Sequence, residues 1–425
     1  MRRLYRFILC LFALVGILHL FRALNRFRVL RLDPIPFAPQ YDAIYLAGRR
    51  TNDLEPIELF TVINGACAAN RAVVSLKSML YFQGRYKTAS KFCPSVSNRP
   101  PGIVCQNQSL EPYRPVRLHW VADVAAKDRL IYIFEEWHPS DVHIYLYNYE
   151  QFVSYVGAIP INHYAGTPAM YKILAPYILP EEVTKVIVLD SDVIFNYNVL
   201  ELWKEFERFK PQQVFGAACE QITYCPYSCS SDDTHLPLFG INSGVVLMNL
   251  TELRRTNWWY QWQQEVLKEV TDLGYLPVAE QKVINEIMGR NITLYYRLGC
   301  EWNVQVFKAD GIQCCPVQWI DRLPHETYCK NNLDDANPRE PARLVHYNIK
   351  RKPEGCGQYA PSSMDFQAGL AEMSLGLLLL WDTLCDCATT QWELVWRIDT
   401  PSTTTRSAVK EEKIFHNKSS KEMLM

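Results

Sequence analysis

The stretch Lys185–Asp192 constrains the fold more than any other, because an apolar run ends there in two carboxylates. Val186 to Leu189 are apolar and mostly β-branched, which is typical of a short strand buried on both faces. Asp190 and Asp192 follow directly, separated by one serine. Two acids at the end of a buried strand lose hydration and need a cationic partner. A hard divalent ion that also carries phosphate oxygens, Mn²⁺ or Mg²⁺, is the simplest partner.

An Asp-x-Asp sequence alone is weak, since most such pairs are ordinary acidic turns. The rest of the chain strengthens it. Strand-like runs at 58–64, 116–122 and 142–147 alternate with helix-like segments such as 69–82 and 163–179. This alternation predicts an α/β fold with a doubly wound, mainly parallel sheet. Ligands of such sheets gather at the carboxyl ends of the strands, which is where the acidic pair is expected.

The stretch 239–248 predicts a turn followed by another buried strand, and polar residues accompany the turn. Gly240 and Gly244 allow the backbone to approach a ligand closely, and Asn242 and Ser243 offer directional hydrogen bonds. A plain loop that leads into a strand is an equally good interpretation of this stretch taken alone.

Two further groups of residues are candidates for the same site. Glu280 and Gln281 stand just before an apolar helix start, where an acid also suits the helix dipole. His346 ends a short predicted strand, and a basic run that includes Lys352 follows it. A lone histidine is more often structural. Beside two acids, however, His346 is a candidate third metal ligand, and the lysines are candidates for phosphate binding.

The cysteines and glycosylation acceptors indicate an oxidising compartment. Of the 14 cysteines, 13 follow the N-terminal apolar run, and Asn-x-Ser/Thr acceptors begin at 107, 249, 291 and 417. A zinc cluster is the alternative, but no pair of cysteines recurs at zinc spacing. Disulfides in a secretory lumen explain the cysteines better. The formal net charge of -1 gives no indication of nucleic acid as a partner.

The N-terminus predicts a membrane attachment. Basic residues within 1–6 precede an apolar run at 7–21, which is shorter than the roughly 20 residues of a full span. We expect a cytosolic tail at 1–6, a signal anchor at 7–21 and a proline-containing stem at 22–57, with a cleaved signal as the alternative. A catalytic domain is expected at 58–390 and a polar C-terminal tail at 391–425. Because a short span suits thin early secretory membranes, we expect a single-pass type II protein with a lumenal catalytic domain.

In this order, the motifs Asp190-Ser-Asp192, Gly240-Ile-Asn-Ser-Gly244, Glu280-Gln281 and His346 with Lys352-Pro353 resemble those of family 8 retaining glycosyltransferases. That family has a GT-A fold and uses nucleotide sugars. The chain is more closely similar to the xylosyltransferase domain of LARGE-type enzymes, on Asn162-His-Tyr-Ala-Gly166 and Trp302-Asn-Val-Gln305 among other stretches. Glucoside xylosyltransferases share part of this pattern. A Golgi location follows from the resemblance, with the endoplasmic reticulum as the alternative.

The resemblance implies roles residue by residue. Mn²⁺ would be held by Asp190, Asp192 and His346, with Mg²⁺ as the alternative. Donor-binding residues would be Thr61 and Asn64 for uridine, Lys172 for phosphate or sugar, Asn242 and Ser243 for the sugar, and Lys352 for the diphosphate. Gln281 would lie close to the anomeric carbon, and Glu280 is a candidate nucleophile.

The activity implied is transfer of xylose from UDP-xylose to a glycan acceptor on a glycoprotein. UDP-glucose or UDP-galactose as donor, and an inactive lectin-like scaffold, are the alternatives. The chain departs from the family pattern at Ile349, where a glycine is usual, at Glu354, where a tryptophan is usual, and at Glu280, where an aspartate is usual. About 60 residues follow the matching stretch. We therefore expect a single transferase domain rather than a bifunctional polymerase.

Overall fold

The computed structural model describes residues 11–18, 42–83, 85, 113–221, 235–306, 315, 317 and 342–348. Lys352 and the C-terminal tail expected at 391–425 lie outside these residues. A short helix covers 11–18, and no helix among the described residues is long and apolar enough to cross a membrane.

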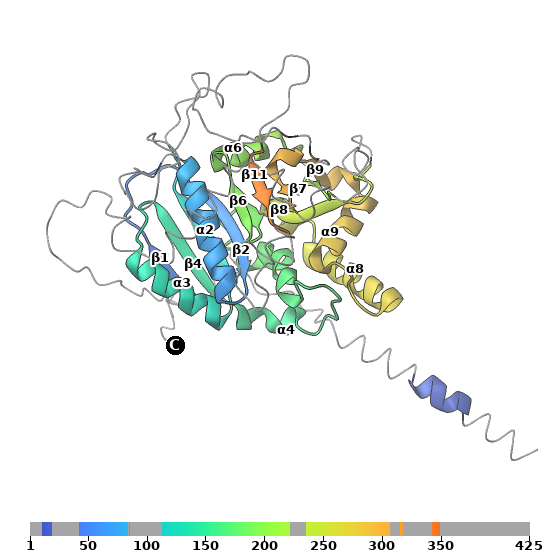
Figure 1. Ribbon diagram of the computed structural model, residues 1–425. Coiled ribbons are helices and arrows are strands. Elements are labelled where there is room, and N and C mark those ends of the chain that lie inside the picture. The colour runs from blue at the N-terminus through green and yellow to red at the C-terminus, as the bar shows by residue number, and fades with distance from the viewer. Residues whose placement is uncertain are drawn as a thin grey trace, which may run out of the picture.

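One large sheet organises the described part of the chain (Figure 1). Its order is β1-β4-β3-β2-β5-β8-β7-β9, in which β4, β3, β2 and β5 run parallel and β1 and β8 run antiparallel to their neighbours. The bounds are β1 Ala43–Ala47, β2 Ile57–Ile63, β3 Val116–Ala122, β4 Val142–Asn148, β5 Lys185–Leu189, β7 Phe215–Cys219, β8 Ile241–Asn249 and β9 Tyr295–Arg297. The predicted strands at 58–64, 116–122, 142–147 and 185–189 are therefore present.

A second, three-stranded sheet lies beside the first. It has the order β10-β11-β6, with β6 Val193–Phe195, β10 Val304–Gln305 and β11 Leu344–His346. β11 pairs antiparallel with β6, so that His346 stands opposite Val193. The backbone N–H of Tyr347 donates to the carbonyl of Asp192 at 2.9 Å. The pairing of β11 with β6 therefore places the end of β11 next to Asp190 and Asp192, although the two segments are far apart in the sequence.

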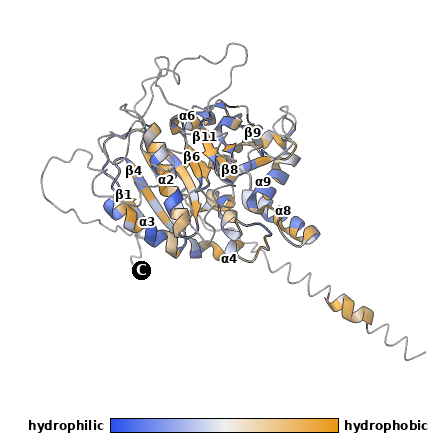
Figure 2. Ribbon diagram, in the orientation of Figure 1, coloured by the Kyte–Doolittle hydropathy of each residue, from blue (hydrophilic) through white to orange (hydrophobic). Residues whose placement is uncertain are grey.

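Helices cover the large sheet on both faces, and a separate apolar core fills each interface. Apolar residues are frequent along the central strands in Figure 2, as expected for a sheet covered on both faces. One face carries α2 Ala66–Phe82 and α3 Val124–Glu136, which lie side by side over β2, β3 and β4 (Figure 1). The other face carries η3 Thr167–Leu174, α5 Ala175–Ile178, α7 Leu250–Arg255, α8 Trp258–Leu273 and α9 Ala279–Arg290. Shorter elements are η2 Tyr149–Phe152, α4 Val153–Val156, α6 Val199–Lys204, η4 Glu205–Arg208, η6 Ile292–Leu294 and η7 Cys300–Trp302.

The segment before the central strand differs from the single helix predicted at 163–179. It forms the 3₁₀-helix η3 and then the one-turn helix α5. Pro168 stands in the first turn of η3 and Pro176 in that of α5. Each proline lacks a backbone N–H and crowds the carbonyl four residues earlier, so one continuous α-helix cannot form across them.

The stretch 239–248 also differs in detail from the prediction. β8 begins at Ile241, so Asn242 and Ser243 lie inside the strand rather than in the turn before it. The pairing of β7 with β8 contains a register shift between Ala217 and Cys219. Such an irregularity bends a strand and redirects its side chains, and it occurs here beside the candidate site.

Candidate active site

The acidic pair and the histidine converge as predicted. His346 Nε2 lies 3.4 Å from Asp190 Oδ2 and 3.5 Å from Asp192 Oδ1, and the potential ligand atoms of the three residues all lie within 4.8 Å of one another. Asp192 and His346 are buried, whereas the Asp190 side chain is 32% exposed. The cluster therefore has one side open to a ligand.

The protonation of this cluster matches a cation site. Burial disfavours the imidazolium form of His346, but hydrogen bonds to Asp190 and Asp192 and the charges of these carboxylates outweigh it and raise the pKa of His346 to about 9. Burial raises the pKa of Asp190, and the nearby Lys172 ammonium overcomes this and lowers it. A proton on Nε2 thus stands where two carboxylates favour a positive charge. Carboxylate oxygens with one imidazole nitrogen are a donor set suited to Mn²⁺ or Mg²⁺, so the residues fit a divalent ion.

Gly244 makes room for the histidine. A Cβ atom built on Gly244 would lie 2.1 Å from Cε1 of the His346 ring. The backbone at this residue is also fixed, because its carbonyl accepts the Asp190 N–H at 2.9 Å. The glycine in the motif thus serves a close packing of ring against strand.

Lys172 is buried next to Asp190, Asp192 and His346, which together form the candidate metal triad. Its Nζ lies 2.6 Å from Asp190 Oδ1 and 2.9 Å from Glu280 Oε1, and it donates to the carbonyl of Ser243 at 3.1 Å. Burial lowers the pKa of Lys172, but the Asp190 and Glu280 charges outweigh this effect and the net shift is upward. Lys172, which was expected near phosphate or sugar, is held among protein acceptors.

The two residues at the start of α9 join the same network. The Ser243 hydroxyl donates to Glu280 Oε1 at 2.9 Å, and the Ser243 N–H donates to Gln281 Oε1 at 2.9 Å. Asn242 Oδ1 lies 3.1 Å from His346 Nδ1. The sequence candidates at 242, 243, 280 and 281 thus lie together beside the metal triad.

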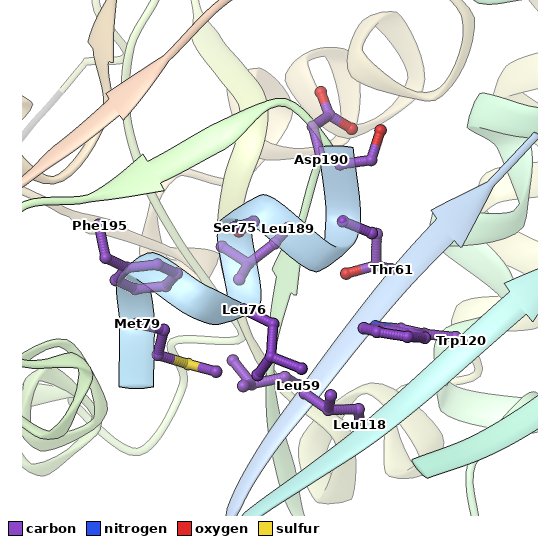
Figure 3. A pocket seen from close by; sticks show the side chains of 12 residues that line it. Leu59, Thr61, Ser75, Leu76, Met79, Leu118, Trp120, Leu189, Asp190 and Phe195 are labelled. Atoms are coloured by element: carbon purple, nitrogen blue, oxygen red, sulfur yellow. The ribbon is translucent and has the colours of Figure 1, made fainter. Parts of the chain in front are cut away.

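Of the two residues expected to bind uridine, Thr61 and Asn64, only Thr61 lies in a cavity with Asp190. Thr61 and Asp190 line one small cavity between β2, β5 and α2, with Ser75, Trp120 and Ser191 (Figure 3). Its volume of about 20 Å³ has room for about one water molecule. Asn64 is exposed just after β2 and does not line this cavity.

Glu220 belongs to the site although the sequence analysis did not select it. Its Oε2 accepts from Asn242 Nδ2 at 3.0 Å and from Gln281 Nε2 at 2.8 Å. A signal was present, because Glu220 directly follows β7 as Asp190 directly follows β5. Both strands run antiparallel to β8, so their carboxyl ends lie at the same edge of the sheet.

Comparison with known proteins identifies the family to which the chain belongs. The model of glycosyl transferase family 8 matches residues 123–353, more than half of the chain. Mouse xylosyl- and glucuronyltransferase LARGE2 is 28% identical over 285 residues, which cover 64% of this chain and 41% of LARGE2. Chicken LARGE2s is 32% identical over 271 residues, which cover 61% of this chain and 37% of that protein. The chain thus spans less than half the length of these relatives.

Two solved structures are also similar to the chain at low sequence identity. The apo form of mouse xyloside xylosyltransferase 1 superposes with a TM-score of 0.46 at 17% identity, covering 69% of this chain and 98% of that one. The galactosyltransferase LgtC with donor and acceptor sugar analogues superposes with a TM-score of 0.44 at 13% identity, covering 75% and 96%. The mainly parallel central sheet with helices on both faces is a GT-A-like glycosyltransferase fold, as predicted. The chain is a member of glycosyl transferase family 8.

Proposed function

We propose that the protein is a divalent-metal-dependent transferase that moves xylose from UDP-xylose to a glycan acceptor on a glycoprotein, with retention of configuration. The observation that carries the proposal is the convergence of Asp190, Asp192 and His346 on one partly open cluster. An inactive scaffold has no need to keep a buried carboxylate, a partly exposed one and a buried histidine aligned, because buried charge destabilises a fold unless it is compensated.

Asp190, Asp192 and His346 would hold Mn²⁺, with Mg²⁺ as the alternative. Bound there, the ion supplies positive charge to the diphosphate leaving group as its bond to the sugar breaks. Lys172 keeps Asp190 ionised and oriented, and Asn242 holds the far nitrogen of the His346 ring. Lys352 remains our candidate for the diphosphate, and Thr61 and Asn64 remain our candidates for uridine.

Glu280 is a poor nucleophile in this arrangement. Its side chain is 3% exposed, and Oε1 is already shared by Lys172 Nζ and the Ser243 hydroxyl. We therefore favour front-face attack by the acceptor hydroxyl, with Gln281 near the anomeric carbon and no covalent sugar–enzyme intermediate. The stereochemistry of the product, read by NMR, checks this: an inverted linkage contradicts it.

The choice of xylose is supported by the relatives, which include xylosyl- and glucuronyltransferases. UDP-glucose and UDP-galactose carry an additional CH₂OH group that the sugar pocket beside Asn242 and Ser243 would have to accept. A donor panel decides between them.

We propose a lumenal catalytic domain at 58–390 on a Golgi type II anchor at 7–21, with 1–6, 22–57 and 391–425 as tail, stem and C-terminal tail. The disulfide chemistry supports an oxidising compartment. Cys300 and Cys315 are bonded to each other. Cys67 and Cys219 each take part in a further disulfide.

The test is donor hydrolysis and transfer by the purified protein across a panel of UDP-sugars, with Mn²⁺ and with EDTA. Asp192→Asn serves as the site variant, and Asp272→Asn, a matched change near the end of α8, serves as the control. Turnover of UDP-xylose that requires both metal and Asp192 supports the proposal. Turnover of a different donor corrects the sugar, and turnover that survives both EDTA and Asp192→Asn contradicts the metal site.

A further inference from the structure

Glu220 links two amides that point in different directions. Asn242 Nδ2 and Gln281 Nε2 both donate to the same carboxylate oxygen, Oε2 of Glu220, at 3.0 and 2.8 Å. An ionised carboxylate has no proton to donate, so each amide must turn its NH₂ group toward Glu220. The carbonyl oxygens of both amides are thereby directed away from it.

The orientation of Asn242 reaches the metal triad. Its Oδ1 accepts from the backbone N–H of Gly244 at 3.0 Å and from Asn303 Nδ2 at 3.0 Å, and it lies 3.1 Å from His346 Nδ1. Facing an oxygen, Nδ1 must carry a proton. Once a bound ion replaces the proton on Nε2 of His346, that nitrogen would offer its lone pair on the side of Asp190 and Asp192.

The opposite orientation of Asn242 would reverse this choice. Its NH₂ group would then face the Gly244 N–H and the Asn303 amide, both of which are donors, and would press Nδ1 of His346 to act as acceptor. The proton would move to Nε2, where it opposes a bound cation. An acceptor at Glu220 therefore disfavours the orientation that blocks the metal side of the ring.

The backbone around Glu220 is fixed by reciprocal glutamine contacts. The Gln221 N–H donates to Gln305 Oε1 at 3.0 Å, and the Gln305 N–H donates to Gln221 Oε1 at 2.9 Å. Gln305 Nε2 also donates to the carbonyl of Cys219 at 2.9 Å. Gln305 belongs to β10, which pairs with the strand that carries His346. Gln305 therefore holds the backbone beside Glu220 and, through β10, the strand that carries His346.

We propose that Glu220 is a positioning residue. Through the Asn242 amide it keeps the proton of a metal-binding His346 on Nδ1, which leaves Nε2 for the metal, and it also holds the Gln281 side chain. This inference rests on the proposed metal-dependent function. It places the role of Glu220 in the acceptor oxygen rather than in the negative charge.

Two substitutions separate the oxygen from the charge. Glu220→Gln loses the charge but keeps an oxygen that can accept from both amides. Glu220→Met has nearly the same shape and provides no oxygen. Each variant of the full-length chain is titrated with Mn²⁺, alone and with UDP, and free Mn²⁺ is followed by electron paramagnetic resonance, so that no turnover is needed. Glu201→Gln, on the surface of α6, is the control, and Glu220→Leu replaces the methionine variant if that protein does not fold.

We expect Glu220→Met to weaken Mn²⁺ binding about 10- to 100-fold, the range seen when a group that orients a metal ligand is removed. Glu220→Gln should stay within about threefold of the wild-type protein. Equal losses in both variants overturn the inference in favour of a charge effect, and unchanged binding in both overturns it outright. Asp192→Asn in the same titration distinguishes a failure of the proposed metal site from a failure of the inference about Glu220. If the wild-type protein binds no Mn²⁺, or if Asp192→Asn binds it equally well, the proposed metal site falls and this inference falls with it.

Discussion

Lys172 Nζ lies 2.6 Å from Asp190 Oδ1, and the lysine side chain is almost completely buried. The same ammonium contacts Glu280 at 2.9 Å, so one buried cation joins the end of the central strand to the start of α9. The Lys172 ammonium holds one carboxylate oxygen of Asp190, and the other oxygen of Asp190 faces His346.

Replacing Lys172 by methionine is expected to destabilise the protein by about 3–5 kcal/mol, because two carboxylates then lose their buried partner. The free energy of unfolding in urea measures this. Lys204→Met is the matched control, since Lys204 pairs with Glu201 on the partly exposed side of α6, and surface pairs contribute about 0–1 kcal/mol. The double variant Lys172→Met/Glu280→Gln should recover part of the loss, because it removes one of the stranded charges. Equal stabilities of the Lys172 and Lys204 variants would contradict the buried ion pair.

Gly244→Ala should impair metal binding because the added methyl group overlaps the His346 ring. We expect at least a tenfold weaker Mn²⁺ affinity, measured by titration of free Mn²⁺, together with lower thermal stability. Gly289→Ala is the control on α9, since its Cβ would lie 3.7 Å from the nearest atom outside its own helix turns, Leu236 Cδ1. An alanine there is favourable in a helix by roughly 0.5–1 kcal/mol relative to glycine. Full Mn²⁺ affinity in Gly244→Ala would show that the ring does not need this space.

The metal-free protein should lose stability as the pH rises from about 6.5 through 9. The folded-state pKa of His346 is raised to about 9 from an ordinary value of 6.5, so folding favours the protonated ring. Its contribution is fully present below pH 6.5 and disappears as the pH passes the folded pKa. Urea unfolding in EDTA at pH 6, 7.5 and 9 measures the slope, and His346→Gln should flatten it. A slope that is the same with and without His346 would assign the pH dependence to other groups.

Arg254 is expected to be a structural anchor of the segment that leads into the central strand. Its guanidinium donates to the carbonyls of Pro176, Leu179, Pro180, Glu181 and Val183, at 2.7 to 3.0 Å. Arg254→Ala should lower the free energy of unfolding by about 2–4 kcal/mol, since several partly buried carbonyls lose a charged donor. The neighbouring Arg255→Ala is the control and should have no measurable effect, because Arg255 pairs on the surface with Glu252. Similar losses in the two variants would contradict the anchoring role.

The sequence determined those parts of the protein that depend on local pattern. Predominantly apolar runs predicted the strands at 58–64, 116–122 and 185–189, because strands covered on both faces are mostly apolar. The order of four motifs predicted the family, which the comparison confirmed. Local pattern was less reliable around Pro168 and Pro176, where helical periodicity was correct but the missing backbone N–H groups divided one predicted helix into two short elements.

The tertiary structure alone decided which side chains meet. His346 reaches Asp192 because β11 pairs with β6, and Lys172 faces Glu280 because η3 packs against α9. Glu220 contacts the amides of Asn242 and Gln281 because β7 pairs with β8. Hydrophobic periodicity specifies which face of each element is buried. The mutual orientation of polar groups at a sheet edge depends instead on strand order and register, which no single stretch of the chain encodes.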